Sequence, residues 1–372
     1  MIYLDYQATT PLAPEARAAM RPFLEESFGN PHSPHRLGRE AAAAVEVARA
    51  RVAAPFAGEP GRLLFTSGAT EAANWALKGA ALTAPEGRRG IVTIATEHAC
   101  VLDTVGWLGT QGFDVTVLPV GADGVVDLDR AAAAIDGRTL LVAAMLVNNE
   151  IGVIQPIETL SRLAHAAGAL FFCDAVQGYG RVPLPLAACD MIAISAHKIY
   201  GPKGIGALWL RDGIALPPLL HGGGQEGGIR SGTLSPALCA GFGAAAALAA
   251  ERMEADTVHV EALWGGARAM LKDWTLNGSA EARWHGNLNL RHDGVDAARL
   301  ISEVRQVAFS AGSACASGSG RPSHVLRAIG LSDAQARASI RLGFGRYTTL
   351  KEIEEAMTMI RDAAGRQRIW AA

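Results

Sequence analysis

The chain has 372 residues, of which 49% are hydrophobic and 19% are charged, and 34 basic against 36 acidic side chains give a formal net charge of −2. The high hydrophobic fraction excludes a disordered chain, and the balanced charge argues against direct nucleic acid binding, which needs a basic face. The five cysteines form no CxxC pair, which disfavours a disulfide framework or zinc knuckle and favours a reducing compartment.

The N-terminal residues enter a strand-like run at once, without the basic and apolar regions of a signal peptide. The longest nearly apolar stretch, residues 236–250, is too short to span a membrane. We therefore expect a cytoplasmic protein without a membrane partner. The charged fraction lies below the roughly 25% that is usual for globular domains, so we also expect part of the surface to be buried against a second copy of the chain.

In chain order, short apolar runs alternate with helical patterns. Strands are predicted at residues 62–66, 91–96, 115–120, 139–147, 169–173 and 191–194. Helices are predicted at residues 69–82, from residue 99, at 129–135, 157–167 and 235–253. Continuously apolar strands that alternate with helices indicate a mainly parallel sheet covered on both faces.

The rhythm changes after about residue 255. Shorter strands are predicted at residues 287–290 and 307–309, and helices at 297–303 and 350–364. This pattern indicates a smaller α+β unit, which the first residues of the chain are expected to join. The predicted domains are therefore residues 12–254 for the large one, and residues 1–11 with 255–372 for the small one.

Two side chains at predicted strand ends suggest cofactor chemistry. Lys198 follows an apolar strand and precedes a Gly-Pro turn, where a lysine can form a Schiff base, although a lone lysine is more often a surface residue. Asp174 ends another apolar strand, and a buried Asp needs a cationic partner, such as a pyridinium nitrogen. A lysine paired with such an Asp is the signature of pyridoxal phosphate (PLP) enzymes. Gln177 could reach the ring hydroxyl, whereas Asp174 could instead simply cap a helix.

Two further segments carry weaker signals. Ala69 and Thr70 open a helix after a strand and a Gly turn, and backbone N–H groups at such a terminus bind phosphate. Ser67 or Thr70 could equally cap that helix. His98 follows a strand and could stack on an aromatic ring or move protons, although a lone histidine is more often structural.

Taken together, the ordered motifs resemble the cysteine desulfurases of the NifS and IscS type, within the class V aminotransferase group. The resemblance runs nearly end to end, through residues 3–11, 29–33, 147–152, 221–226, 230–233, 313–315 and 339–341. It implies PLP fold type I, with a large domain built on a mainly parallel sheet and a smaller α+β domain. The spacing from Cys315 to residues 323–327 resembles the long-loop branch of the family.

The resemblance also implies a role for each matching position. Lys198 would bind the cofactor and move the substrate's Cα proton, His98 would stack on the ring, and Cys315 would be the nucleophile. The cofactor-binding set would be Ala69, Thr70, His98, Asn149, Asp174, Gln177, Ser195, His197, Lys198 and Thr233, with Thr233 serving the partner subunit of a homodimer. Asn30, Asn149 and Arg341 would hold the substrate. No metal ligand is expected among these residues.

The implied reaction takes sulfur from L-cysteine, leaves L-alanine and forms a persulfide on Cys315. The persulfide would pass its sulfur to an acceptor, such as an iron–sulfur cluster scaffold or a tRNA-thiolation enzyme. A selenocysteine lyase or an aminotransferase is the alternative within the family, and Cys315 distinguishes the transaminase because that reaction needs no mobile nucleophile. A non-catalytic sulfur or iron–sulfur carrier is the alternative outside it, and such a carrier would not need Lys198, Asp174 and His98.

Overall fold

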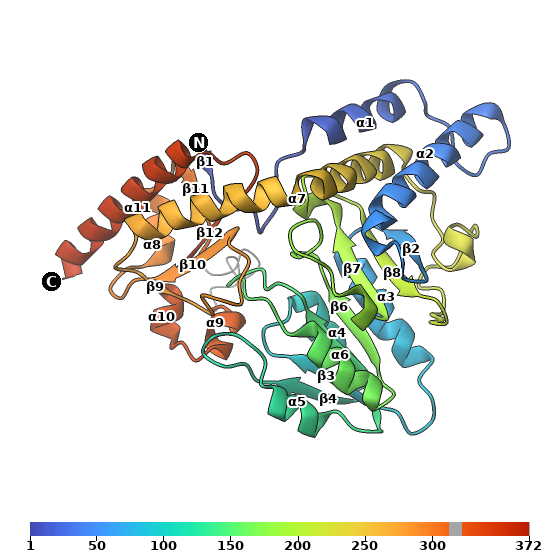
Figure 1. Cartoon of the computed structure of the whole chain (residues 1–372), viewed down its shortest axis with the longest axis horizontal. Coiled ribbons are helices and arrows are strands. Elements are labelled where there is room, and N and C mark those ends of the chain that lie inside the picture. Colours follow the sequence, from blue (N-terminus) through green and yellow to red (C-terminus); the bar gives the residue numbers. More distant parts are fainter. Residues whose placement is uncertain (312–321, 372) are drawn as a thin grey trace.

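The computed structural model describes residues 1–311 and 322–371, and its centre is a seven-stranded sheet (Figure 1). The strands are β2 (Gly61–Thr66), β3 (Gly90–Ile94), β4 (Asp114–Leu118), β5 (Thr139–Met145), β6 (Leu170–Asp174), β7 (Met191–Ser195) and β8 (Gly206–Arg211). Their order is β2-β8-β7-β6-β5-β3-β4, and only β8 runs antiparallel to its neighbours β2 and β7. The prediction of a mainly parallel sheet is therefore confirmed.

Helices cover both faces of this sheet, as its continuously apolar strands require. The helices of this part are α1 (Pro14–Glu25), α2 (Arg36–Ala53), α3 (Ala69–Leu82), α4 (Ala99–Thr110), α5 (Leu128–Ala134) and α6 (Ile157–Ala166), with short 3₁₀ turns η1 (Ala54–Phe56), η2 (Leu186–Ala188), η3 (Ala196–Lys198) and η4 (Glu226–Gly228). Successive strand residues point to opposite faces. Accordingly, Phe172 packs in the cluster that contains Trp75 of α3, whereas Phe171 packs in the cluster that contains Val45 of α2.

A separate hydrophobic core lies in the C-terminal part of the chain. It contains β9 (Thr275–Leu276), β10 (Asn287–Arg291) and β12 (Ser339–Gly343), which form a three-stranded antiparallel sheet, and also α8 (Ala297–Glu303) and α11 (Leu350–Ala371). Strand β1 (Ile2–Tyr3) pairs in parallel with β11 (Val307–Ala308), so Ile2 and Leu4 are buried in this core. Helices α9 (His324–Ala328) and α10 (Asp333–Arg337) contribute Val325, Leu326 and Ala336 to a small cluster that also contains Ile151 and Val153.

Helix α7 (Pro236–Met270) connects the two cores as one helix of 35 residues (Figure 1). The prediction of a helix ending at residue 253 was wrong, because the charged residues after Ala250 continue the helix on its exposed side. Arg252 and Asp256 lie 3.3 Å apart there as an i,i+4 ion pair. Phe242 is buried in the first core and Leu263 in the second. The domain boundary expected at residue 254 thus falls inside a continuous helix.

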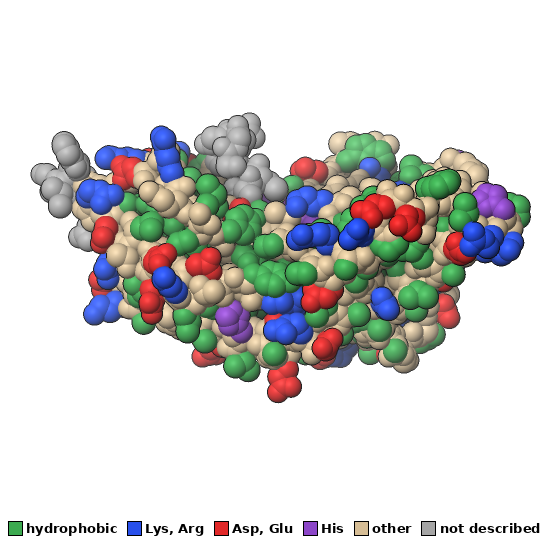
Figure 2. Space-filling view, turned by 90° about the horizontal axis from the view of Figure 1, so that it is seen from above, with side chains coloured by type: hydrophobic (Ala, Val, Ile, Leu, Met, Phe, Trp, Pro, Cys, Tyr) green, Lys and Arg blue, Asp and Glu red, His purple; other side chains and the backbone are tan. Residues whose placement is uncertain are grey.

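The surface charge and the helix lengths indicate which kinds of partner the protein could contact. On the face shown in Figure 2, acidic and basic side chains are interspersed and do not gather into a field of one sign. Within the described residues, no helix combines the length and apolar character that a bilayer crossing requires.

Candidate active site

A cavity of about 590 Å³ opens at the C-terminal ends of three parallel strands. Met145, Asp174 and Ser195 are the last residues of β5, β6 and β7, and each lines the cavity. Ligands of parallel α/β sheets bind at this edge. Of the residues expected from the sequence, the cavity brings together Ala69, Thr70, His98, Asn149, Asp174, Gln177, Ser195, His197, Lys198 and Arg341.

Two expected residues do not line this cavity, and a third cannot be placed relative to it. Asn30 is exposed in the loop between α1 and α2, where its Oδ1 accepts a hydrogen bond from the His32 amide at 2.9 Å. Thr233 is exposed in the loop before α7. Cys315 lies outside the described residues.

Lys198 ends the short turn η3 and reaches back to the N-terminal segment. Its Nζ donates hydrogen bonds to the carbonyls of Gln7 at 2.6 Å and Ala8 at 2.8 Å. Two residues later, Tyr200 adopts a φ of 68°, which is costly for a residue with a side chain. Its amide donates to the Thr10 hydroxyl at 2.7 Å, so the N-terminal segment fixes the turn that presents the lysine.

Asp174 is buried at the end of β6, with 5% of its surface exposed. One carboxylate oxygen accepts the Val176 amide at 3.0 Å. Burial raises the pKa of this carboxyl, and the hydrogen bond from the Val176 amide and the charge of Lys198 oppose the rise. A cation placed against Asp174 would keep it ionised, so the site fits a protonated ring nitrogen.

His98 is held in one protonation form by its position at the start of α4. Its Nδ1 accepts the Cys100 amide at 3.1 Å and thereby caps the helix. Burial lowers the pKa of the imidazole. A neutral ring whose Nδ1 accepts must carry its proton on Nε2, so His98 has one N–H to donate.

The N-terminus of α3 also lines the cavity. None of the described side chains caps this helix, and Gly68, Ala69 and Thr70 line the cavity. Glu71 in its first turn is already engaged, because it accepts the Ser67 amide at 2.8 Å and pairs with Arg230 at 2.7 Å. The free backbone N–H groups and the helix dipole suit a phosphate.

Ser195 and His197 also line the cavity. Burial lowers the pKa of His197 to about 4. This histidine is therefore neutral near pH 7 and offers a hydrogen bond instead of a charge.

Arg341 of β12 brings a cation to the cavity from the second core. The residue is 1% exposed. Its Nη2 lies 2.7 Å from Asp5 Oδ1, and its Nη1 donates to the Asn149 carbonyl at 3.1 Å. The Nε group has no hydrogen-bond partner among the described residues. That nitrogen is buried, but Nη1 carries two protons and donates only one of them to Asn149. A donor thus remains for an anionic group, as expected for a carboxylate-binding arginine.

Sequence reasoning gave no role to several residues that line this cavity. These are Gln7, Ala8, Thr9, Cys100, Met145, Val176, Lys203 and Gly204. The carbonyls of Gln7 and Ala8 matter most, because they position Lys198. The segment at residues 3–11 belonged to the family pattern, and that was the one signal available.

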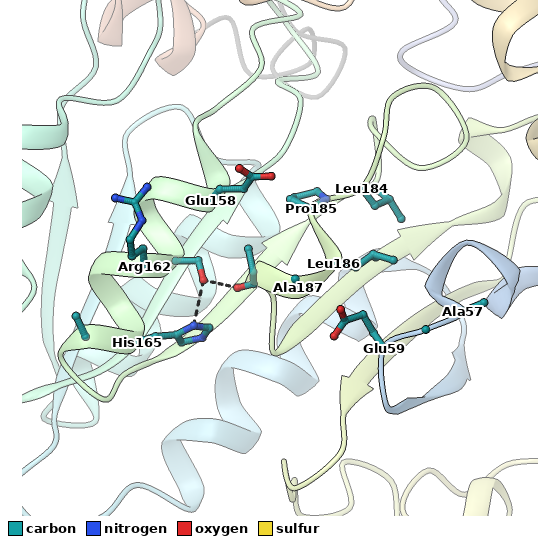
Figure 3. A pocket seen from close by; sticks show the side chains of 13 residues that line it. Ala57, Glu59, Glu158, Arg162, His165, Leu184, Pro185, Leu186 and Ala187 are labelled. Atoms are coloured by element: carbon teal, nitrogen blue, oxygen red, sulfur yellow. Dashed lines mark hydrogen bonds between the residues drawn. The ribbon is translucent and has the colours of Figure 1, made fainter.

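A second cavity of about 860 Å³ contains none of the expected residues (Figure 3). It is lined by Ser161 and His165, and His165 Nε2 lies 2.9 Å from Asp190 Oδ2. The Ser161 hydroxyl donates its single proton to the Ala188 carbonyl. It therefore has no proton for His165 to take, and the group is not arranged as a nucleophile and base.

Comparison with known proteins supplies independent information. The family model described as Aminotransferase class-V matches residues 2–356. Over 368 residues, the chain is 44% identical to the cysteine desulfurase IscS of Rickettsia akari (strain Hartford) and 45% identical to that of Rickettsia bellii (strain OSU 85-389), with 96% of this chain and 90% of each relative covered.

Solved structures agree with these relatives. A structure described as a NifS-like protein superposes with a TM-score of 0.92 at 33% identity, covering 98% of this chain and 99% of the other. The structure titled SspA in complex with cysteine gives a TM-score of 0.83 at 36% identity, covering 94% of this chain and 100% of the other.

Proposed function

Because the chain belongs to the class V aminotransferase family and, within it, to the cysteine desulfurases, we propose that it takes sulfur from L-cysteine and passes it on through Cys315. The enzyme depends on PLP, as this family does. The observation that carries the proposal is the meeting of Lys198, Asp174, His98 and Arg341 around one cavity, although they come from distant parts of the chain.

The residues present fit the cofactor at both of its ends. Asp174 would hold the ring nitrogen, and Lys198 would hold the aldehyde carbon. The uncapped N-terminus of α3, with Ser195 and His197, would hold the phosphate. When bound, PLP acts as an electron sink for negative charge that develops at the substrate's Cα.

The chain's own groups would then share the remaining tasks. Lys198 would remove the proton from the substrate's Cα, since its Nζ is held at the cavity wall by two carbonyls. His98 would stack on the ring and keep its Nε2 proton available. Arg341 would bind the substrate carboxylate, with Asn149 beside it and Asn30 as a further contact.

Cys315 would complete the sulfur transfer. Its thiolate would attack the sulfur atom of the substrate, forming an S–S bond. The C–S bond of the substrate would break, and its electron pair would pass to the carbon that becomes the methyl group of L-alanine. The resulting Cys315 persulfide is a reversible modification, so it can pass sulfur to an acceptor.

We also propose a homodimer with shared sites. Thr233 is exposed and away from the cavity of its own chain, which suits a residue that serves the partner's phosphate. Mixing a Lys198→Ala chain with a Thr233→Ala chain tests this arrangement. Each hybrid dimer should have one site with both defects and one intact site, so activity should return on mixing. A strictly monomeric, active protein would refute the proposal.

The central test separates cofactor binding from sulfur transfer. The purified protein should be yellow, and Lys198→Ala should lose both the visible absorbance and the activity. Cys315→Ser should keep the absorbance, form no persulfide detectable by mass spectrometry, and release almost no alanine. If Cys315→Ser released alanine and sulfide at the wild-type rate, the enzyme would be a lyase without a covalent sulfur intermediate.

The acceptor is a separate question. We propose an iron–sulfur cluster scaffold or a tRNA-thiolation enzyme in the cytoplasm. Affinity capture with the persulfidated enzyme, followed by transfer of labelled sulfur to the purified candidate, tests this directly. An acceptor that receives no label from the wild type, or receives it equally from Cys315→Ser, is excluded.

A further inference from the structure

Arg181 does not line the active-site cavity, but it contacts two residues that do. It lies in the turn region after β6. Its Nη1 donates to Oε1 of Gln177, and its Nη2 donates to the carbonyl of Lys198 at 2.5 Å. One guanidinium therefore holds both the side chain of Gln177 and the backbone of Lys198.

The contact with Gln177 determines what this amide offers to a ligand. Because Oε1 accepts from Arg181, the amide nitrogen lies on the other side, where it donates to the Gln7 carbonyl at 3.0 Å. An amide nitrogen carries two protons, so one remains for the cavity. A flipped amide would turn its nitrogen toward the guanidinium, which is donor-only. Gln177 consequently presents a donor to the cavity.

The charge of Arg181 is also unusual. Among residues 1–311 and 322–371, no carboxylate forms an ion pair with it, and the Trp284 ring lies 4.4 Å from its guanidinium carbon. Burial lowers the pKa of Arg181 to about 10, so the group is still charged at neutral pH. A partly buried cation without a carboxylate is costly, and a nearby anionic oxygen would offset part of that cost.

We propose that Arg181 is a positioning residue that locks the Gln177 amide as a donor and thereby selects a ligand with an anionic oxygen at that wall of the cavity. The inference rests on the proposed function, in which this oxygen is the phenolic oxygen of PLP. The planar fork of arginine suits the task, because it reaches two acceptors in different directions at once. A lysine, with one nitrogen, would hold only one of them well.

The test measures cofactor binding by the protein freed of PLP, with absorbance of the added cofactor as the readout. Arg181→Met should weaken PLP binding by roughly tenfold, the factor that corresponds to about 1.4 kcal/mol. It should also shift the absorption band of the bound cofactor. Arg181→Lys should restore part of both. Gln177→Glu keeps an oxygen for Arg181 but removes the donor, so it should weaken binding as well.

A matched control is Arg88→Met. Arg88 also donates to two backbone carbonyls, those of Thr139 at 2.7 Å and Ala167 at 3.0 Å, but it is not part of the cavity. Its loss should lower thermal stability without shifting the absorption band. In a Gln177→Ala background, Arg181→Met should change the band little further, because the residue through which it acts is gone.

The outcomes are distinguishable. A wild-type protein that binds no PLP would refute the proposed function itself. A wild type that binds PLP, together with an Arg181→Met variant of unchanged affinity and band, would overturn the role of Arg181 alone. The same conclusion would follow if Arg181→Met had an equal effect with and without Gln177. If Arg181→Met does not fold, Arg181→Lys and Gln177→Glu decide, and wild-type affinity and band in both would overturn the inference.

Discussion

Replacing Arg341 by lysine tests the substrate-binding side of the site. The guanidinium divides its donors among Asp5, Asn149 and Ser310, and its Nε has no partner among the described residues. A lysine would keep the charge and one strong contact, most simply the one with Asp5, but not a second contact with a substrate carboxylate. The expected loss is one charge-assisted hydrogen bond, worth about 1.5–3 kcal/mol. The specificity constant should therefore fall by roughly 10- to 100-fold.

The assay is alanine release over a range of cysteine concentrations, with cofactor absorbance and thermal unfolding measured on the same preparations. Because the ammonium group of the Arg341→Lys variant would still pair with Asp5, absorbance and unfolding temperature should change little. Arg291→Lys on the neighbouring strand is the control, since Arg291 bonds to Asn277 Oδ1 at 3.0 Å outside the cavity. If the specificity constant of Arg341→Lys stayed within about twofold of wild type, Arg341 would not bind the substrate. If the variant lost the cofactor absorbance, the role of Arg341 would be structural.

Three further predictions follow from buried groups. Burial raises the pKa of Glu97 well above its ordinary value of 4.5, so the folded state holds this proton longer and stability falls as pH rises above that value. The Glu97→Gln side chain cannot ionise, so its free energy of unfolding in urea should rise relative to that of the wild type between pH 4.5 and neutrality. If the difference between the two free energies did not change with pH, the reasoning would be contradicted. Glu226 pairs with Arg49 at 2.6 Å and has a side chain 1% exposed, so Glu226→Ala should lose about 3–5 kcal/mol in urea unfolding, and a loss below about 1 kcal/mol would refute the reasoning. Burial also raises the pKa of Cys100, so iodoacetamide should leave it unlabelled near neutral pH, as peptide mass spectrometry would show; rapid labelling would contradict this.

Local signals allowed parts of the fold to be predicted closely. Helix α3 begins and ends where the sequence placed it, since a Gly turn precedes it and its apolar positions recur regularly. Helix α8 does as well, and its Asp296 cap is visible in the sequence. Strand β8 was not predicted, and neither was its antiparallel place between β2 and β7, because an apolar run does not specify its partner. Helices α1 and α2 were also missed.

The candidate site also has parts that the sequence could predict and parts that it could not. Asp174 ends a strand and Lys198 and His98 each follow one, and the ends of parallel strands meet at one edge, so their proximity could be expected. The contacts of Lys198 with the Gln7 and Ala8 carbonyls join residues about 190 positions apart. Backbone carbonyls carry no sequence signature, so only the tertiary structure reveals them. Arg181 was missed for a similar reason, because two of its acceptors are also carbonyls.

Helix α7 has a consequence for how the molecule comes apart. Its 35 residues extend over roughly 50 Å, at 1.5 Å per residue, and its two halves bury side chains in different cores. If either core melted alone, half of the helix would lose its packing, and helices this exposed are marginal in water. The stability of each core therefore depends on the other core, because both pack against the same helix. Unfolding should be more cooperative than two cores joined by a flexible tether would allow, and a proteolytic cut near the middle of α7 should weaken both.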